Sequence, residues 1–316
     1  LIEERKIDLN EKVSFYWPEY GCNGKEDTKI IDLLTHRAGM FAFEDNFTIT
    51  HEDWTNWNLF VTKLEKQKPF YTPGSTQSYH ALTFGFLVGE VVRRVDGRSL
   101  GTYFKEKIAD NYNIDFIFGL GNEDINRTSD IVMSKIRSPV LAKAFFSMPS
   151  WLLPKRIRPV VSLLKESDFQ KAFFNTQTEK NSVNSYAWKK AEIPAANGFA
   201  SAKGISRVYS VLSDLNDNSF IKRETLEQAI KVHSSGPDTV LLNLPIKFCL
   251  GFMIENPYSP LGQNPDLFGH SGVGGSVGFA DKKRGIGFGF VKNYMHPPGK
   301  LFKSANDLTK LFYSIL

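Results

Sequence analysis

Two short stretches of this sequence carry groups suited to acyl transfer. Tyr79 supplies a phenol, and the run His270-Ser271-Gly272 reads as a strand with further glycines around it. A serine hydroxyl needs a base when it attacks a carbonyl, and the leaving group needs an acid; a phenol held beside a cationic lysine can serve both steps. Tyr79 is therefore a candidate proton relay, and taken alone it can equally be a tyrosine that only packs its ring where a helix begins.

The glycines after His270 predict the second half of such a site. A tetrahedral oxyanion needs two preorganised N–H donors, one usually from the nucleophile and one from an edge strand. By position the strand donor is the backbone N–H of Val273, and Gly272 leaves room for a substrate to approach the strand closely. The residues expected to line the substrate cleft are His80, His270, Ser271 and Gly274. The alternative for His270 is a strand histidine that is hydrogen-bonded to a neighbour.

The elements that must position these residues change character along the chain. Helices are expected over 30–34, 82–95 and 202–212, and residues 41–72 are expected to form loops. Strands are expected over 251–254, 276–280 and 286–291, the last two joined as a hairpin through 281–285. Gly97 suits the position after a helix C-terminus, and Ser304 with Asp307 predicts a capping box for a final amphipathic helix.

This order predicts an α+β fold in which an antiparallel sheet lies towards the C-terminus. We expect one domain over 1–316, with a mostly helical region (1–200) and a sheet region that ends in a C-terminal helix (201–316). With 316 residues, of which 41% are hydrophobic and 13% aromatic, the chain can bury a large core, which argues against disorder.

Composition excludes several classes of protein. Cys22 and Cys249 lie far apart without a C-x-x-C spacing, so neither a disulfide framework nor a zinc site is indicated, and an intracellular location is favoured. No H-E-x-x-H or comparable cluster points to a metal, and no motif points to a cofactor. No apolar run of about 18 residues predicts a membrane span.

The net charge of +5 is concentrated in one aromatic, proline-rich segment over 131–175. Between 135 and 171 eight basic residues face two acidic ones, so this stretch alone carries +6. The segment is interpreted as a cover of short helices with solvated charges, or as a surface that contacts a membrane or lipid. A nucleic-acid partner is not expected, because no binding motif accompanies the charge.

Three ordered motifs resemble signatures of one enzyme family. They are Leu33-Leu34-Thr35-His36-Arg37-Ala38-Gly39, then Pro73-Gly74 with Ser78-Tyr79-His80-Ala81, then Phe268-Gly269-His270-Ser271-Gly272-Val273-Gly274-Gly275. Their order and spacing are similar to those of the serine beta-lactamase-like family, which includes class C beta-lactamases, penicillin-binding proteins and related esterases. Asn197-Gly198-Phe199-Ala200-Ser201 also resembles a linking segment of this family. The resemblance implies an antiparallel sheet flanked by terminal helices and a large helical insertion, with the active site in the cleft between them.

The resemblance also implies a Ser-x-x-Lys helix, whose serine is acylated, before the tyrosine motif. Leu1–Asn10 resembles the stretch just after that helix, so we expect the chain to be N-terminally incomplete and the nucleophile to lie upstream of Leu1. Ser-x-x-Lys pairs occur at Ser162/Lys165 and Ser219/Lys222, but both follow Tyr79, and composition alone predicts about two such pairs. The run 269–273 lacks the last glycine and the strand-turn-helix setting of a G-x-S-x-G elbow.

Two departures from the family's pattern narrow the substrate. Ala81 stands where lactamases have an asparagine that holds the acylamino group, and His270 replaces the lysine of Lys-Thr-Gly. An imidazole is mostly neutral at pH 7 and is a poor clamp for a carboxylate. We therefore expect a small neutral ester or amide substrate, as in the esterase branch, the alternative being a non-catalytic relative that binds or scaffolds. His36 is expected to be structural.

Overall fold

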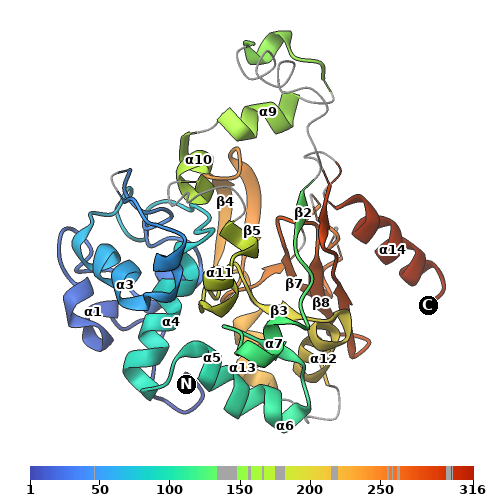
Figure 1. Cartoon of the computed structure of the whole chain (residues 1–316), viewed down its shortest axis with the longest axis horizontal. Coiled ribbons are helices and arrows are strands. Elements are labelled where there is room, and N and C mark those ends of the chain that lie inside the picture. The colour runs from blue at the N-terminus through green and yellow to red at the C-terminus, as the bar shows by residue number, and fades with distance from the viewer. Residues whose placement is uncertain are drawn as a thin grey trace.

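The sheet that carries His270 and the helices that surround Tyr79 lie side by side in the computed structural model of the chain (Figure 1). The structure describes residues 1–45, 47–133, 148–155, 158–165, 167–174, 182–214, 220–254, 256–257, 259–261, 264–296, 300 and 302–316.

Within the described residues the largest sheet has six antiparallel strands in the order β4-β5-β6-β7-β8-β9. They are β4 (Ser234–Asp238), β5 (Leu244–Phe248), β6 (Met253–Ile254), β7 (Leu267–Ser271), β8 (Val277–Asp281) and β9 (Ile286–Phe290). His270 pairs with Gly278, and Ser271 pairs with Val277. The hairpin expected over 276–291 is confirmed, and each strand end differs from the prediction by at most one residue. Of the strand expected over 251–254, only the last two residues form a strand, β6.

Helices cover both faces of this sheet. On one face α12 (Ala202–Leu212) lies against glycines, and a Cβ at Gly287 would come within 2.1 Å of the Ser206 carbonyl oxygen. On the other face α14 (Lys303–Ser314) packs Phe312 against Phe288, with ring centroids 5.7 Å apart. Glycines on one face and phenylalanines on the other therefore let two helices pack at different depths. The expected capping box is wrong: α14 begins at Lys303, its N-cap is Phe302, and no side chain caps it.

The helical region is built around α4 (Thr83–Asp96), which ends at Gly97 with a φ of 89°, as expected. It packs against α2 (Ile30–Leu34) and α3 (Trp57–Lys66). The α3 helix contradicts the loop expected over 41–72. Its start is capped by the Asn56 side chain, which accepts from the backbone N–H of Leu59, and it buries Phe60, Val61 and Leu64. The aromatic residues of this stretch therefore form core and not a loop.

Short elements complete the described chain. The helices are α1 (Val13–Tyr16), α5 (Leu100–Phe104), α6 (Asp110–Tyr112), α7 (Asn122–Ile125), α9 (Arg158–Lys165), α10 (Ser167–Phe174), α11 (Tyr186–Lys190) and α13 (Arg223–Ala229). The 3-10 turns are Pro18–Tyr20, Glu52–Thr55, Ser150–Leu152 and Ser182–Asn184, and Lys105–Ala109 is a π-turn. The small strands pair as β1 (Phe116–Ile117) with β3 (Phe199–Ala200), and as β2 (Val132–Met133) with β10 (Tyr294–Met295).

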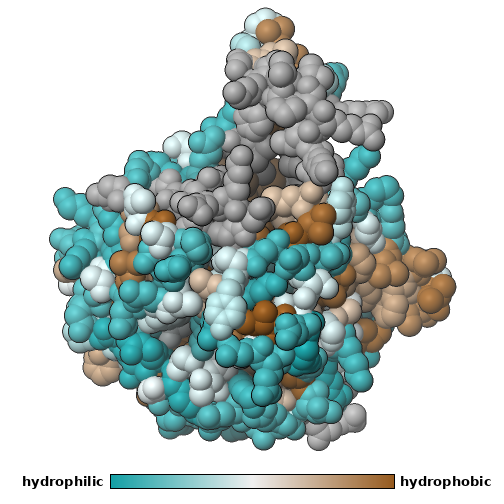
Figure 2. Space-filling view, viewed as in Figure 1, coloured by the Kyte–Doolittle hydropathy of each residue, from teal (hydrophilic) through white to brown (hydrophobic). Residues whose placement is uncertain are grey.

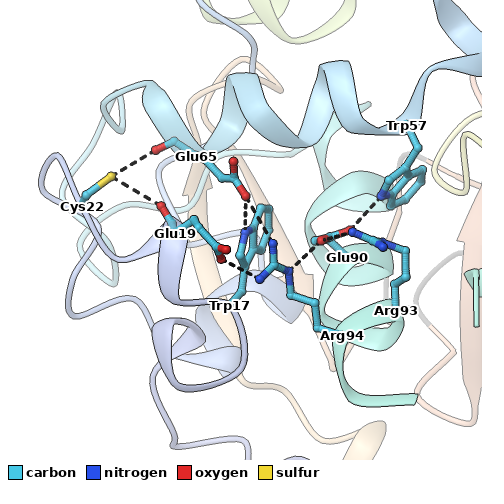
Figure 3. A network of polar contacts seen from close by, with 8 residues as sticks. All are labelled: Trp17, Glu19, Cys22, Trp57, Glu65, Glu90, Arg93 and Arg94. Carbon is cyan, nitrogen blue, oxygen red and sulfur yellow. Dashed lines mark hydrogen bonds and ion pairs between the residues drawn. The ribbon is translucent and has the colours of Figure 1, made fainter. Parts of the chain in front are cut away.

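A buried polar network fastens α3 to α4 (Figure 3). The Glu90 carboxylate is fully buried and accepts hydrogen bonds from Trp57, Arg93 and Arg94. Arg94 extends the network to Glu19 and Glu65, and Glu65 also accepts a hydrogen bond from Trp17 Nε1. A buried carboxylate is tolerated here because several donors surround it.

The basic segment over 131–175 is described only in part. Lys135, Arg137, Lys143, Phe145, Phe146 and Arg156, which belong to the expected surface, lie outside the described residues. Helix α10 behaves as a cover: Phe169 and Ala172 are buried against Phe41 and Val240. Trp151 is 71% exposed, and the expected membrane contact stays a prediction.

Apolar side chains also gather over α14 on the surface in Figure 2. Leu308, Leu311 and Ile315 are exposed there, while Ala305 and Thr309 are buried. In the described part of the chain, no helix has both the length and the apolar character that a membrane crossing requires.

Candidate active site

The structure brings Tyr79 and His270 together from the two regions of the chain. Tyr79 Oη lies 3.5 Å from His270 Nε2, and the two rings are 5.9 Å apart and inclined by 26°. The His270 Nδ1–H donates to the Ser271 carbonyl oxygen at 2.9 Å, so in the neutral ring Nε2 is the acceptor. The Tyr79 hydroxyl therefore faces an acceptor at a distance that is slightly too long for a strong hydrogen bond.

Burial holds this pair in its uncharged form. It raises the pKa of the half-buried Tyr79 phenol, and the nearby Asp238 carboxyl raises it further. It lowers the pKa of His270, although the hydrogen bond to Ser271 acts in the opposite direction. At neutral pH the site therefore presents a phenol that can donate a proton and an imidazole that can accept one.

The turn between β7 and β8 contains the expected oxyanion donor. The Gly272 N–H donates to the Ser276 carbonyl oxygen, and the Gly275 N–H donates to that of Gly272, both at 2.8 Å. Val273 lies in this turn, just beyond the end of β7, and is 56% exposed. Its backbone N–H makes no hydrogen bond to any described residue. That N–H is therefore free to bind a substrate oxygen, whereas the N–H of Gly272 is already used.

His80 does not join this group, although it follows Tyr79 directly. Its side chain is 1% exposed, its Nδ1–H donates to the Ser78 carbonyl oxygen at 2.6 Å, and its Nε2 accepts from the Met40 N–H at 3.1 Å. Burial lowers its pKa to about 4. Because both ring nitrogens bond the main chain, His80 is a neutral residue that braces the wall behind the tyrosine.

His36 has a similar supporting position. Its ring centroid is 4.9 Å from that of Tyr79 and 4.4 Å from that of Phe248, and its Nδ1 accepts the His80 N–H. Burial and the neighbouring histidines lower its pKa well below the usual value. A ring packed in this way agrees with the structural role expected for His36.

The sequence predicted neither the β4–β5 hairpin nor the position of Asp238 beside Tyr79. Asp238 Oδ1 accepts the Tyr79 N–H at 3.1 Å across 159 residues of chain. The strands have the sequences Ser-Ser-Gly-Pro-Asp and Leu-Pro-Ile-Lys-Phe, whose glycine and prolines are typical of turns. Their antiparallel pairing over five residue pairs identifies them as sheet, and no local pattern in the sequence predicts that pairing.

The internal Ser-x-x-Lys pairs gain no support from their surroundings. Ser162 and Lys165 lie on α9, where the Lys165 ammonium group donates to the Met148 carbonyl oxygen. Ser219 lies outside the described residues.

The chain was compared with known protein families and with individual proteins. The pattern of the beta-lactamase family matches residues 1–310. The chain is 28% identical over 305 residues to the esterase/beta-lactamase LipL of Mycobacterium tuberculosis; the match covers 94% of this chain and 66% of that protein, so the chain spans about two thirds of that relative's length.

Solved structures of related proteins have a similar fold. A family VIII carboxylesterase is 30% identical with a TM-score of 0.78, and a penicillin-binding protein homolog from Caulobacter crescentus is 28% identical with a TM-score of 0.75. Each alignment covers 97% of this chain and 78% of the other. The expected beta-lactamase/transpeptidase-like fold is thus confirmed. The chain belongs to the beta-lactamase family.

Proposed function

We propose that this protein is a serine hydrolase that cleaves a small neutral ester or amide through an acyl-serine intermediate. The observation that carries this proposal is the Tyr79 phenol, which faces the His270 Nε2 acceptor at 3.5 Å. The N–H of Val273, which bonds none of the described residues, supplies one oxyanion donor. The names of the relatives, a carboxylesterase and an esterase/beta-lactamase, support the same class of reaction.

The acylated serine and its lysine are proposed to lie on a segment that precedes Leu1 in the full-length protein. Glu3 accepts hydrogen bonds from the Lys222 N–H and from Thr225 Oγ1, so the start of the described chain lies beside residues 220–225. Phe220 and Ile221 help to line an apolar cavity of about 360 Å³. Its other lining residues are Phe104, Phe116, Ile205, Val208, Tyr209, Leu212 and Phe252. This pocket is partly open to solvent, and an apolar helix that covered its side chains would remove apolar surface from water, which is favourable.

The proton balance then follows from the groups present. The serine oxygen forms a bond to the acyl carbon. Its proton passes to the pair formed by the lysine of the Ser-x-x-Lys segment and the Tyr79 phenol. Tyr79 donates a proton to the leaving alcohol or amine as the scissile bond breaks, and His270 Nε2 holds the phenol in place between steps. A water molecule then forms a bond to the acyl carbon of the acyl-serine and gives up a proton to the same groups. The bond between the acyl carbon and the serine oxygen breaks, the carboxylic acid leaves, and the proton returns to the serine oxygen.

The side chains at positions 270 and 81 favour a neutral substrate. Burial keeps His270 uncharged, so it offers no cation to a substrate carboxylate, and Ala81 has no amide to hold an acylamino group. We therefore expect the protein to hydrolyse penicillins and cephalosporins, which carry a carboxylate, much more slowly than neutral esters.

The direct test is the hydrolysis of short-chain nitrophenyl esters by the full-length protein and by its Tyr79→Phe variant. We expect ester turnover by the wild type, little turnover of lactams, and a loss of kcat of about 100-fold or more in the variant, since general acid–base catalysis contributes that much. Normal turnover in Tyr79→Phe would remove the relay role. A folded full-length protein without ester turnover would favour a binding or scaffolding function.

A further inference from the structure

Asp238 lies at the end of β4 and is a buried carboxylate outside the chemical steps described above. Its side chain is fully buried, and its Oδ1 accepts three main-chain N–H groups, from Tyr79 at 3.1 Å and from Val240 and Leu241 at 3.0 Å each. The last two bonds close the local turn after β4. The first one reaches the residue that carries the relay phenol.

The neighbouring contacts show that the tyrosine segment is docked on the β4–β5 hairpin residue by residue. The Thr239 N–H donates to the Gln77 carbonyl oxygen at 3.2 Å, and Thr239 Oγ1 donates to Ser78 Oγ at 3.0 Å. Gln77 Nε2 donates to the Ile246 carbonyl oxygen at 3.1 Å. Asp238 adds the bond at Tyr79 itself, so it fixes the main chain from which the phenol projects.

A buried negative charge on Asp238 lowers stability, and the two hydrogen bonds that close the turn do not require a charge. The Asp238 Oδ2 is buried and makes no hydrogen bond of normal geometry within the described residues. Burial raises the pKa of the carboxyl to about 6, although the Tyr79, Leu241 and Val240 amides and the Gln77 side chain all act to lower it. An asparagine could accept the same turn hydrogen bonds without a buried charge. Aspartate and asparagine both offer an acceptor oxygen to the Tyr79 N–H, whereas alanine leaves that N–H without this bond, so the contact to Tyr79 depends on the acceptor oxygen at position 238.

We propose that Asp238 is a positioning residue for Tyr79, and that it holds the phenol opposite His270 Nε2 by fixing the Tyr79 main chain. This inference rests on the proposed role of Tyr79 as proton relay. It predicts that Asp238 acts on the rate of reaction and not on substrate affinity.

Asp281 provides a matched control. It is also a fully buried carboxylate at the end of a strand, and its Oδ1 accepts the N–H groups of Lys283 and Arg284 at 3.1 Å each. It pairs with Leu267, whereas the site lies at the other end of β7 beside Ser271. Its Oδ2 also pairs with the Arg284 guanidinium at 2.9 Å and accepts a hydrogen bond from Tyr313 Oη at 3.0 Å. Asp281→Ala therefore removes at least as many contacts as Asp238→Ala, but at a distance from the site.

Kinetics of the full-length protein test the proposal. For Asp238→Ala we expect kcat for ester hydrolysis to fall about 100-fold while KM changes less than about twofold, because a shift of about 1 Å in a catalytic group has this effect. Asp238→Asn should recover most of the rate, because its amide oxygen accepts the same N–H groups. Asp281→Ala should lower stability and keep kcat. Equal losses of kcat in Asp238→Ala and Asp281→Ala would overturn the positioning role.

Hydrogen exchange at the Tyr79 amide gives a readout that does not depend on activity. We expect faster exchange in Asp238→Ala than in the wild type, and near-normal protection in Asp238→Asn and Asp281→Ala. Unchanged protection in Asp238→Ala would overturn the inference by itself. An inactive wild type would instead overturn the proposed function, and the exchange rates would still decide whether Asp238 holds Tyr79.

Discussion

Tyr79 and His270 are separated by 191 residues in the chain, yet their polar atoms meet. Each is held by main-chain contacts: the Tyr79 N–H bonds Asp238, and the His270 ring bonds the carbonyl oxygen of Ser271. Behind them, His36 and His80 are buried neutral rings. At the scale of residues the candidate site is therefore a polar pair supported by uncharged aromatic groups.

The buried ring of His80 predicts a pH dependence of stability. Its pKa is lowered to about 4 in the folded protein, against about 6.5 in an unfolded chain. Between pH 6.5 and 4 the unfolded state binds a proton that the folded state does not, so the free energy of unfolding should fall as pH falls, by up to about 3 kcal/mol from His80. The buried His36 ring, 5.5 Å away, acts in the same direction.

Urea unfolding between pH 7 and pH 4 measures this effect. His80→Gln should show a shallower pH dependence than the wild type, because glutamine can both accept the Met40 N–H and donate to Ser78 without titrating. His233→Gln, which replaces a histidine whose Nε2 bonds the Gln228 carbonyl oxygen, is measured alongside as a histidine-to-glutamine control outside the site. An unchanged slope in His80→Gln would contradict the burial argument.

At the scale of elements, hydrogen bonds and ion pairs around Glu90 connect helix α4 to helix α3 (Figure 3). Glu90→Ala leaves Trp57, Arg93 and Arg94 without their shared acceptor and should lower the free energy of unfolding by about 1–3 kcal/mol, mainly through the donors left unsatisfied. Glu19→Ala removes the exposed partner of the same Arg94 and should cost less than about 1 kcal/mol. Denaturant unfolding of both variants checks the prediction, and a Glu90→Ala loss as small as that of Glu19→Ala would show that the network does not support α4.

Elements with strong local signals were predictable, and those fixed by distant contacts were not. The helix before Gly97 and the hairpin over 276–291 have clear endings and alternation, and both were expected to within about two residues. The β4 and β5 strands contain Gly236, Pro237 and Pro245, and they become strands only through their mutual pairing. The same reason hid Asp238, whose contact with Tyr79 exists only once that hairpin is docked.

At the scale of the whole molecule, the sheet and the helical region each supply one half of the candidate site (Figure 1). The sheet contributes His270 and the N–H of Val273, and the loop before α4 contributes Tyr79. The sequence predicted Val273 as a donor on the strand, whereas β7 ends at Ser271 and Val273 lies in the turn that follows. The acyl acceptor is the remaining part of the proposed mechanism.

The most direct measurement is the covalent labelling of the full-length protein with a serine-directed fluorophosphonate, followed by peptide mapping by mass spectrometry. We predict one adduct per chain, on a serine of a Ser-x-x-Lys sequence upstream of Leu1, formed more slowly in Tyr79→Phe because the serine loses part of its proton relay. A folded protein that takes up no label, or an adduct on Ser162 or another serine within residues 1–316, would contradict the proposed mechanism.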